Sequence, residues 1–247
     1  MNDILIRHLK DLADRSYSHG IFTFSNFLRE EEQAELMEAG LGYAGIMLYG
    51  GTETSDRCVC RFGNPEVMGY DEPFPIVCLK LEPLVMKFGE ELSHRDYLGA
   101  LMNLGIEREL IGDILIDGKC AYIFCMDHIA DYIAEKLGTV RHTSVKVSLL
   151  DEAPEAIQPQ LESLIITAPS ERLDAVVARL YNMSRNQSQA LFTEKKVFVN
   201  GRQCEKGSMV CKAGDKVSVR GYGKFIYDSP AGLTGKGRWR ISIKKYI

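Results

Sequence analysis

The chain has 247 residues, of which 45% are hydrophobic and 26% are charged, and its formal net charge is −4. This composition is ordinary for a globular protein and excludes wholesale disorder, a coiled-coil rod and a collagen-like repeat. The net charge hides an asymmetry, because residues 168–247 hold 16 Lys and Arg against 6 Asp and Glu, whereas residues 1–167 hold 14 against 28. A basic block of this size predicts a surface for a polyanion, although a face that only aids solubility has the same charge.

We expect the chain to carry no targeting or membrane segment. Its N-terminus lacks the basic start and the apolar core of a signal peptide. The longest uncharged stretch, residues 39–52, is rich in Gly and too short to span a bilayer. Seven cysteines, an odd number, fit reduced thiols better than a disulfide framework. We therefore expect a cytoplasmic protein without a membrane partner.

Residues 1–74 are predicted to form helices followed by a β-hairpin. Leu5, Leu9 and Leu12 recur at helical spacing, and a second helical pattern runs through the acidic stretch 29–38. Strands of hairpin length flank Gly50 and Gly51, at residues 44–49 and 57–62.

Residues 75–150 give a clearer pattern, in the order β-α-β-β-α-β. Ser93 and Asp127 are placed to begin the two helices, and the Asp117-Gly118 pair suits a type I′ turn between the two middle strands. This order is that of a ferredoxin-like, or RRM-like, sandwich. Residues 151–160 contain two prolines and little periodicity, so we expect residues 151–167 to be a linker with a lead-in strand.

Residues 168–247 form the basic block. Leu173, Val176, Val177 and Leu180 define the buried stripe of a helix that leaves Arg172, Asp174 and Arg179 off that stripe. Ser184 with Gln187 makes a capping box for a second helix, whose first turn carries Arg185 beside exposed backbone N–H groups. Lys195 and Lys196 follow that helix, before a small hairpin at Asn200-Gly201. Cations at helix ends and turns suit binding to RNA shape and backbone.

The pattern Arg172-Leu173-Asp174, Ser184-Arg185, Val197–Gly201, Gly214-Asp215 and Arg220-Gly221 resembles the S4 RNA-binding domain. One departure is Lys196, which stands where many S4 domains have a glycine. Asp174 suits a structural partner for an arginine better than an RNA contact, and Asn200-Gly201 is first a turn requirement. The resemblance implies an RNA-contacting face, for which we expect Arg172, Ser184, Arg185, Gln189, Lys195, Lys196, Asn200, Arg202, Arg220 and Lys224.

The stretches 93–106 and 111–114, with Tyr49-Gly50-Gly51 and a C-terminal S4 domain, are similar to the YlmH-like family of S4-domain RNA-binding proteins. The resemblance covers nearly the whole chain. It implies an α+β protein with an N-terminal helical and hairpin region (1–74), an RRM-like middle domain (75–150) and an S4 domain (168–247). It also implies binding to structured rRNA or tRNA on the large ribosomal subunit, in rescue or quality control of translation.

His94-Arg95-Asp96 has the letters of a kinase catalytic loop, but Leu101 stands where that loop needs Asn. We expect Asp96 to complete a capping box with Ser93, and His94 and Arg95 to offer a secondary RNA contact. Cys58 and Cys60 have no second pair at zinc-ligand spacing, and residues 232–237 lack the spacing of a phosphate loop. We therefore expect no catalytic residue, metal, cofactor or small-molecule substrate.

Two alternatives stay open on the sequence. The chain could be an RNA-modifying enzyme, of the pseudouridine synthase type, that docks its substrate through S4. It could also be a ribosome-associated adaptor whose acidic front binds a basic protein.

Overall fold

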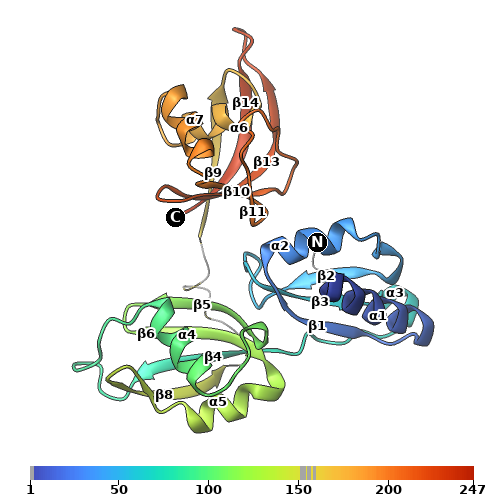
Figure 1. Cartoon of the computed structure of the whole chain (residues 1–247), viewed down its shortest axis with the longest axis vertical. Coiled ribbons are helices and arrows are strands. Elements are labelled where there is room, and N and C mark those ends of the chain that lie inside the picture. Colours follow the sequence, from blue (N-terminus) through green and yellow to red (C-terminus); the bar gives the residue numbers. More distant parts are fainter. Residues whose placement is uncertain (1–2, 151–153, 155–156, 158–159) are drawn as a thin grey trace. The chain divides into compact units, whose positions relative to one another are not determined.

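The computed structural model describes residues 3–150, 154, 157 and 160–247, and divides into two compact units, Met1–Gln158 and Pro159–Ile247 (Figure 1). The predicted α+β class is confirmed by their mixed sheets and helices. Most of the predicted linker, residues 151–160, lies outside the described residues.

The N-terminal part of the first unit is a three-stranded antiparallel sheet, of order β1-β3-β2, against which helix α1 packs through Leu9 and Ala13. The predicted hairpin is present, with Leu48 opposite Cys60. Strand β1 was not predicted, because polar Ser25 and Asn26 interrupt its hydrophobic pattern. The elements are α1 (Asp3–His19), β1 (Thr23–Leu28), α2 (Glu30–Glu38), β2 (Ile46–Tyr49), β3 (Cys58–Phe62) and α3 (Pro65–Met68).

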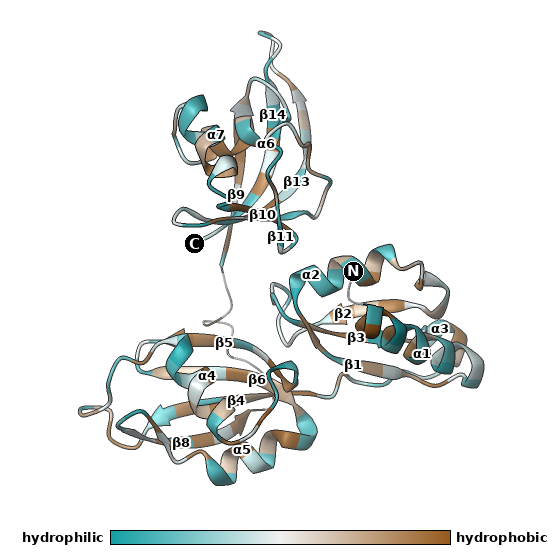
Figure 2. Cartoon of the chain, viewed as in Figure 1, coloured by the Kyte–Doolittle hydropathy of each residue, from teal (hydrophilic) through white to brown (hydrophobic). Residues whose placement is uncertain are grey.

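The middle part of the first unit has the predicted βαββαβ order, with a short additional strand β7. Its sheet is antiparallel, in the order β5-β6-β4-β8-β7, and Figure 2 shows hydrophobic residues along β5, β6 and β8. Leu79 and Leu81 meet Tyr97, Leu101 and Ile133 of the helices on one face. The elements are β4 (Ile76–Pro83), α4 (His94–Asn103), β5 (Ile111–Asp117), β6 (Cys120–Met126), α5 (Ala130–Lys136), β7 (Thr139–Val140) and β8 (Thr143–Leu150).

The other face of the middle sheet is covered by the N-terminal sheet. Phe27 of β1 and Val59 of β3 share one hydrophobic cluster with Cys78, Tyr122 and Phe124. The approach is close enough to require glycine, since a Cβ on Gly112 would lie 2.6 Å from the Phe27 ring. The two sheets therefore form a continuous core within the first unit.

Arg57 ties the same two sheets together with hydrogen bonds. Its guanidinium donates to the carbonyls of Ile111, at 2.9 Å, and of Phe27, at 3.1 Å. In return the Asp113 carboxylate accepts the backbone N–H groups of Asp56 and Arg57, at 2.7 and 3.2 Å. Burial, together with the nearby charge of Arg108, lowers the pKa of Arg57 to about 10, so this arginine is still charged at neutral pH.

The second unit packs two helices against a six-stranded sheet, of order β11-β10-β12-β13-β14-β9. Strand β9, expected as a lead-in to the domain, pairs along its whole length with β14, from Leu161 opposite Tyr246 to Ala168 opposite Trp239. The elements are β9 (Leu161–Ala168), α6 (Leu173–Leu180), α7 (Arg185–Thr193), β10 (Val197–Val199), β11 (Arg202–Gln203), β12 (Lys216–Val219), β13 (Gly223–Leu233) and β14 (Trp239–Tyr246).

Asp174, expected off the buried stripe of α6, is in fact buried, with 2% of its surface exposed. The backbone N–H of Asp174 donates to the carbonyl of Gly207, and the Ser188 hydroxyl donates to the backbone carbonyl of Asp174. The segment before β12 therefore covers the start of α6, a long-range contact that the local helical pattern could not predict.

Gly112→Ala is expected to destabilise the first unit by about 1–3 kcal/mol, because the added methyl overpacks the contact with Phe27. The matched control is Gly99→Ala in α4, where a Cβ meets nothing within 4 Å and helix propensity should raise stability by about 0.5–1 kcal/mol. Unfolding of the full chain by circular dichroism measures both effects. The fluorescence of Trp239, the single tryptophan, reports the second unit and should be unchanged. Equal stabilities for the two variants would contradict the close approach.

Asp174→Asn is expected to destabilise the second unit at neutral pH by about 1–3 kcal/mol. Burial raises the pKa of Asp174, but the hydrogen bonds and charge of Arg172 outweigh it and the net pKa is lowered. The ionised carboxylate therefore stabilises the fold above its unfolded pKa of about 3.9, and this stabilisation is lost as the pH falls through the lower folded pKa. Urea unfolding followed by Trp239 fluorescence should show a flatter acid profile in the variant. A variant as acid-sensitive as the parent would contradict this role.

Candidate nucleic-acid interface

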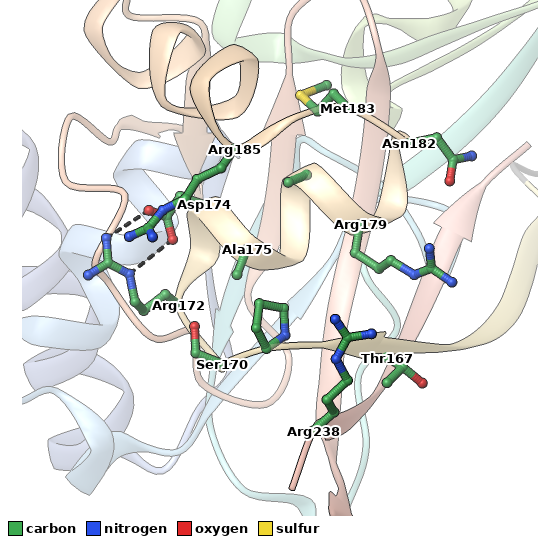
Figure 3. Close-up of a pocket in the computed structure, with 12 residues that line it drawn as sticks. Thr167, Ser170, Arg172, Asp174, Ala175, Arg179, Asn182, Met183, Arg185 and Arg238 are labelled. Carbon is green, nitrogen blue, oxygen red and sulfur yellow. Dashed lines mark hydrogen bonds and ion pairs between the residues drawn. The ribbon is translucent and has the colours of Figure 1, made fainter. Parts of the chain in front are cut away.

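A groove of about 590 Å³ runs beside helix α6 in the second unit (Figure 3). It is built from the outward side of α6, the start of α7, the loop after β9 and the residue before β14. Of the residues that the structure describes, four arginines and one carboxylate line it, together with small, polar and apolar residues. The lining residues are Thr167, Pro169, Ser170, Arg172, Asp174, Ala175, Ala178, Arg179, Asn182, Met183, Arg185 and Arg238.

One arginine of the groove is neutralised by a carboxylate. Arg172 donates from Nε to Oδ1 of Asp174 at 3.0 Å and from Nη2 to Oδ2 at 2.7 Å, in a bidentate pair. Gln189 also hydrogen-bonds to Asp174. The prediction that Asp174 is a structural partner for an arginine is therefore confirmed, and the pair holds Arg172 at one end of the groove.

The start of α7 presents its cation as predicted. Ser184 Oγ accepts the N–H of Gln187 at 3.3 Å, and Gln187 Oε1 accepts the N–H of Ser184 at 2.8 Å, which completes the capping box. Arg185 follows at the first helical position and is exposed. Its guanidinium and the N-terminal backbone groups of α7 can thus meet the same anion.

Two further arginines of the groove were not among the predicted site residues. Arg179 lies on the exposed side of α6, one turn after Ala175. Arg238 lies in the β13–β14 hairpin, and pairing of Trp239 with Ala168 sets it beside the loop that begins at Pro169. Arg179 could have been predicted from the sequence, because it lies off the buried stripe of its helix. The position of Arg238 could not, because it depends on a strand pairing between residues far apart in the chain.

Within residues 160–247, Arg179, Arg185 and Arg238 form no ion pair. Figure 3 shows Arg179 and Arg238 at one end of the groove, and Arg172, Asp174 and Arg185 at the other. The groove therefore has three uncompensated cations, which favour an anionic ligand.

A second group of predicted residues gathers at the turn after α7. The carbonyl of Lys196 accepts the N–H of Arg220 at 2.9 Å, and the Arg220 guanidinium lies 4.5 Å from the ring centre of Phe198. Lys195 and Lys196 have acidic neighbours, with Lys196 Nζ 2.7 Å from Glu194. Many S4 domains have a glycine at the position of Lys196. In this turn the residue with left-handed backbone conformation is the preceding one, Lys195, with φ of 58°.

The remaining predicted residues of the second unit do not join these two groups. Asn200, with φ of 48°, donates to Asp215 at 2.8 Å and accepts the N–H of Lys216 at 2.9 Å, so its side chain serves the turn. Arg202 lies on the two-residue strand β11. Lys224 neighbours Phe225, which packs under the helices, so Lys224 points to the opposite face of the sheet, over the Tyr246 ring.

In the first unit, the two residues predicted to make a secondary RNA contact, His94 and Arg95, differ in charge and environment. Burial, and then the charge of Arg108, lower the pKa of His94, which favours its neutral form at neutral pH. Arg95 is exposed and lines a cleft with Lys136 and Arg141, where Arg141 lies 3.5 Å from Asp96. Asp96 accepts hydrogen bonds from Ser93, which confirms the predicted capping box.

The middle sheet does not offer the aromatic face on which RRM domains stack bases. Its central strand β6 carries Tyr122 and Phe124 on the face away from the helices, but these are only 7% and 2% exposed. The N-terminal residues Phe27 and Val59 occupy that face. An RNA contact by this domain must therefore use another surface.

None of the described helices has both the length and the hydrophobicity of a membrane-spanning segment. In the described part of the chain, no three His, Cys, Asp or Glu side chains are grouped so that they could hold a metal ion.

Comparisons with known proteins agree with the resemblance. Residues 72–153 match the family described as "Putative RNA-binding domain in YlmH", and residues 171–217 match the S4 domain. The "Ribosome-associated protein quality control protein P2" of Bacillus subtilis (strain 168) is 28% identical over 229 residues, which cover 90% of this chain and 86% of that protein. A solved structure, "Cell division protein ylmH from Streptococcus pneumoniae", aligns with 64% of this chain and 93% of its own at 20% identity and a TM-score of 0.49. These domain matches and this relative support the resemblance to the YlmH-like S4-domain proteins.

Proposed function

We propose that this protein binds structured RNA of the large ribosomal subunit, together with an adjoining tRNA, in the cytoplasm. Its role would be that of a binding factor in quality control of translation, without a catalytic step. The observation that carries the proposal is the set of arginines around α6 and α7, on the only strongly basic segment of the sequence. The relative named for ribosome-associated quality control supports the ribosomal setting.

The proposed RNA contacts fall into a groove group and a turn group. The groove group is Arg179, Arg185 and Arg238, with Ser184 shaping the helix start. The turn group is Lys195, Lys196 and Arg220, which share one turn through the Lys196–Arg220 hydrogen bond. Exposed ion pairs are worth about 0–1 kcal/mol, so Glu194 and Glu205 are weak competitors for a phosphate.

The described cysteine thiols do not favour a cysteine nucleophile for the enzyme alternative. The cysteines are buried or half-buried, and burial raises the pKa of Cys60, Cys125 and Cys211 to about 12, so these thiols stay protonated. His94, which has a lowered pKa, lies on α4 and not in the arginine groove. A binding role is the function that this geometry supports best.

Replacing Arg185 and Arg220 by Gln is expected to weaken RNA binding at low salt and to make the dependence on salt shallower. Each lost phosphate contact should reduce the slope of log K against log[salt] by about one. Arg7→Gln in α1 removes one charge from the first unit and is the matched control. Filter binding of a ribosomal RNA fragment over a salt series measures all three proteins. Slopes that do not differ would show that the proposed face does not contact RNA.

Crosslinking in cells, followed by sequencing of the bound RNA, should recover large-subunit rRNA and tRNA. Recovery of mRNA alone would contradict the ribosomal assignment. Incubation of the recovered RNA with the protein, followed by mass spectrometry of the nucleosides, tests the enzyme alternative. A newly modified nucleoside would replace the binding role by a catalytic one.

A further inference from the structure

The groove beside α6 combines an apolar floor with a cationic rim. The floor is made by Ala175 and Ala178 of α6, by Pro169 after β9 and by Met183 before α7. The two alanines are half-buried and leave room where longer side chains would fill the groove. A flat apolar group can therefore lie against α6 without displacing a charged residue.

The rim of the groove selects the charge of the ligand. Arg172 is satisfied by Asp174, while Arg179, Arg185 and Arg238 form no ion pair within residues 160–247. A guanidinium can hydrogen-bond a phosphate and can also stack on the plane of a base. The ligand that matches both floor and rim carries a planar apolar part and more than one negative charge nearby.

The volume of the groove, about 590 Å³, lies in the range of small-molecule sites, about 300–1,000 Å³. A regular RNA duplex cannot enter such a groove, because its bases are stacked inside the helix. An unpaired base can leave the stack, at a cost of a few kcal/mol that is smallest where no pair must be broken.

We propose that this groove binds one unpaired nucleotide that is extruded from a structured RNA. The base would lie on the floor formed by Ala175, Ala178 and Met183, and its flanking phosphates would contact Arg179 and Arg238. This proposal rests on the proposed function, because it names the part of the RNA that the S4 domain selects. Arg238, which lies outside the residues that match the S4 domain, is assigned here as a contact residue.

The test compares two RNA hairpins that differ by one base. The first has a single-nucleotide bulge, and the second has an abasic bulge with the same phosphates. The full chain is expected to bind the first about tenfold more tightly. Ala178→Leu, which fills the floor, should remove this preference and leave the affinity for the abasic hairpin unchanged. Ala190→Leu makes the same change on the exposed side of α7, outside the groove lining, and should keep the preference.

Arg238→Gln should weaken both hairpins and reduce the salt slope by about one. If both hairpins bind equally while binding still depends on salt and on Arg185, the groove proposal fails and the proposed function stands. If neither hairpin nor rRNA binds in a salt-dependent way, the proposed function itself fails. Competition by AMP at micromolar concentration would assign the groove to a free nucleotide and overturn the proposal. The comparison of hairpins on the parent protein decides the question even if Ala178→Leu does not fold.

Discussion

Phe27 and Val59 of the N-terminal sheet pack on the outer face of the middle sheet, and this contact determines which surfaces of the first unit remain available. RRM-like domains bind single strands with aromatic residues of their central strands. Here the corresponding residues Tyr122 and Phe124 serve as core, so the same βαββαβ topology supports a different use. The burial of these two aromatic residues agrees with the negative charge of residues 1–167, because an acidic surface repels the phosphate backbone of RNA.

In the second unit, the buried carboxylate of Asp174 binds one arginine of the groove and leaves the others able to bind a ligand. Asp174 holds Arg172 through both oxygens and is covered by the segment at Gly207. It therefore fixes the first turn of α6 without neutralising Arg179 or Arg185. An anion that binds in the groove therefore contacts arginines that form no ion pair within residues 160–247. Within that range, no existing ion pair has to be broken for this contact to form.

Much of the fold could be predicted because its signals are local. The Asp117-Gly118 turn, the Ser93 and Ser184 caps and the stripe of Leu173, Val176 and Val177 each depend on neighbouring residues, and each is present in the structure. Arg185 was predicted for the same reason. Strand β1, the burial of Asp174 and the position of Arg238 depend on contacts between distant segments, which local periodicity does not report.

The β13–β14 hairpin contributes to the groove beside α6 through Arg238. The match to the S4 domain ends at residue 217, and the residues that follow build a long hairpin against β9. The hairpin also supplies core residues of the second unit, such as Phe225 and Ile241. Its Arg238 forms one wall of the groove, opposite Ala175 and Ala178 of α6. A groove of nucleotide size discriminates by shape as well as charge, so selection of RNA here depends on an unpaired base as much as on phosphates.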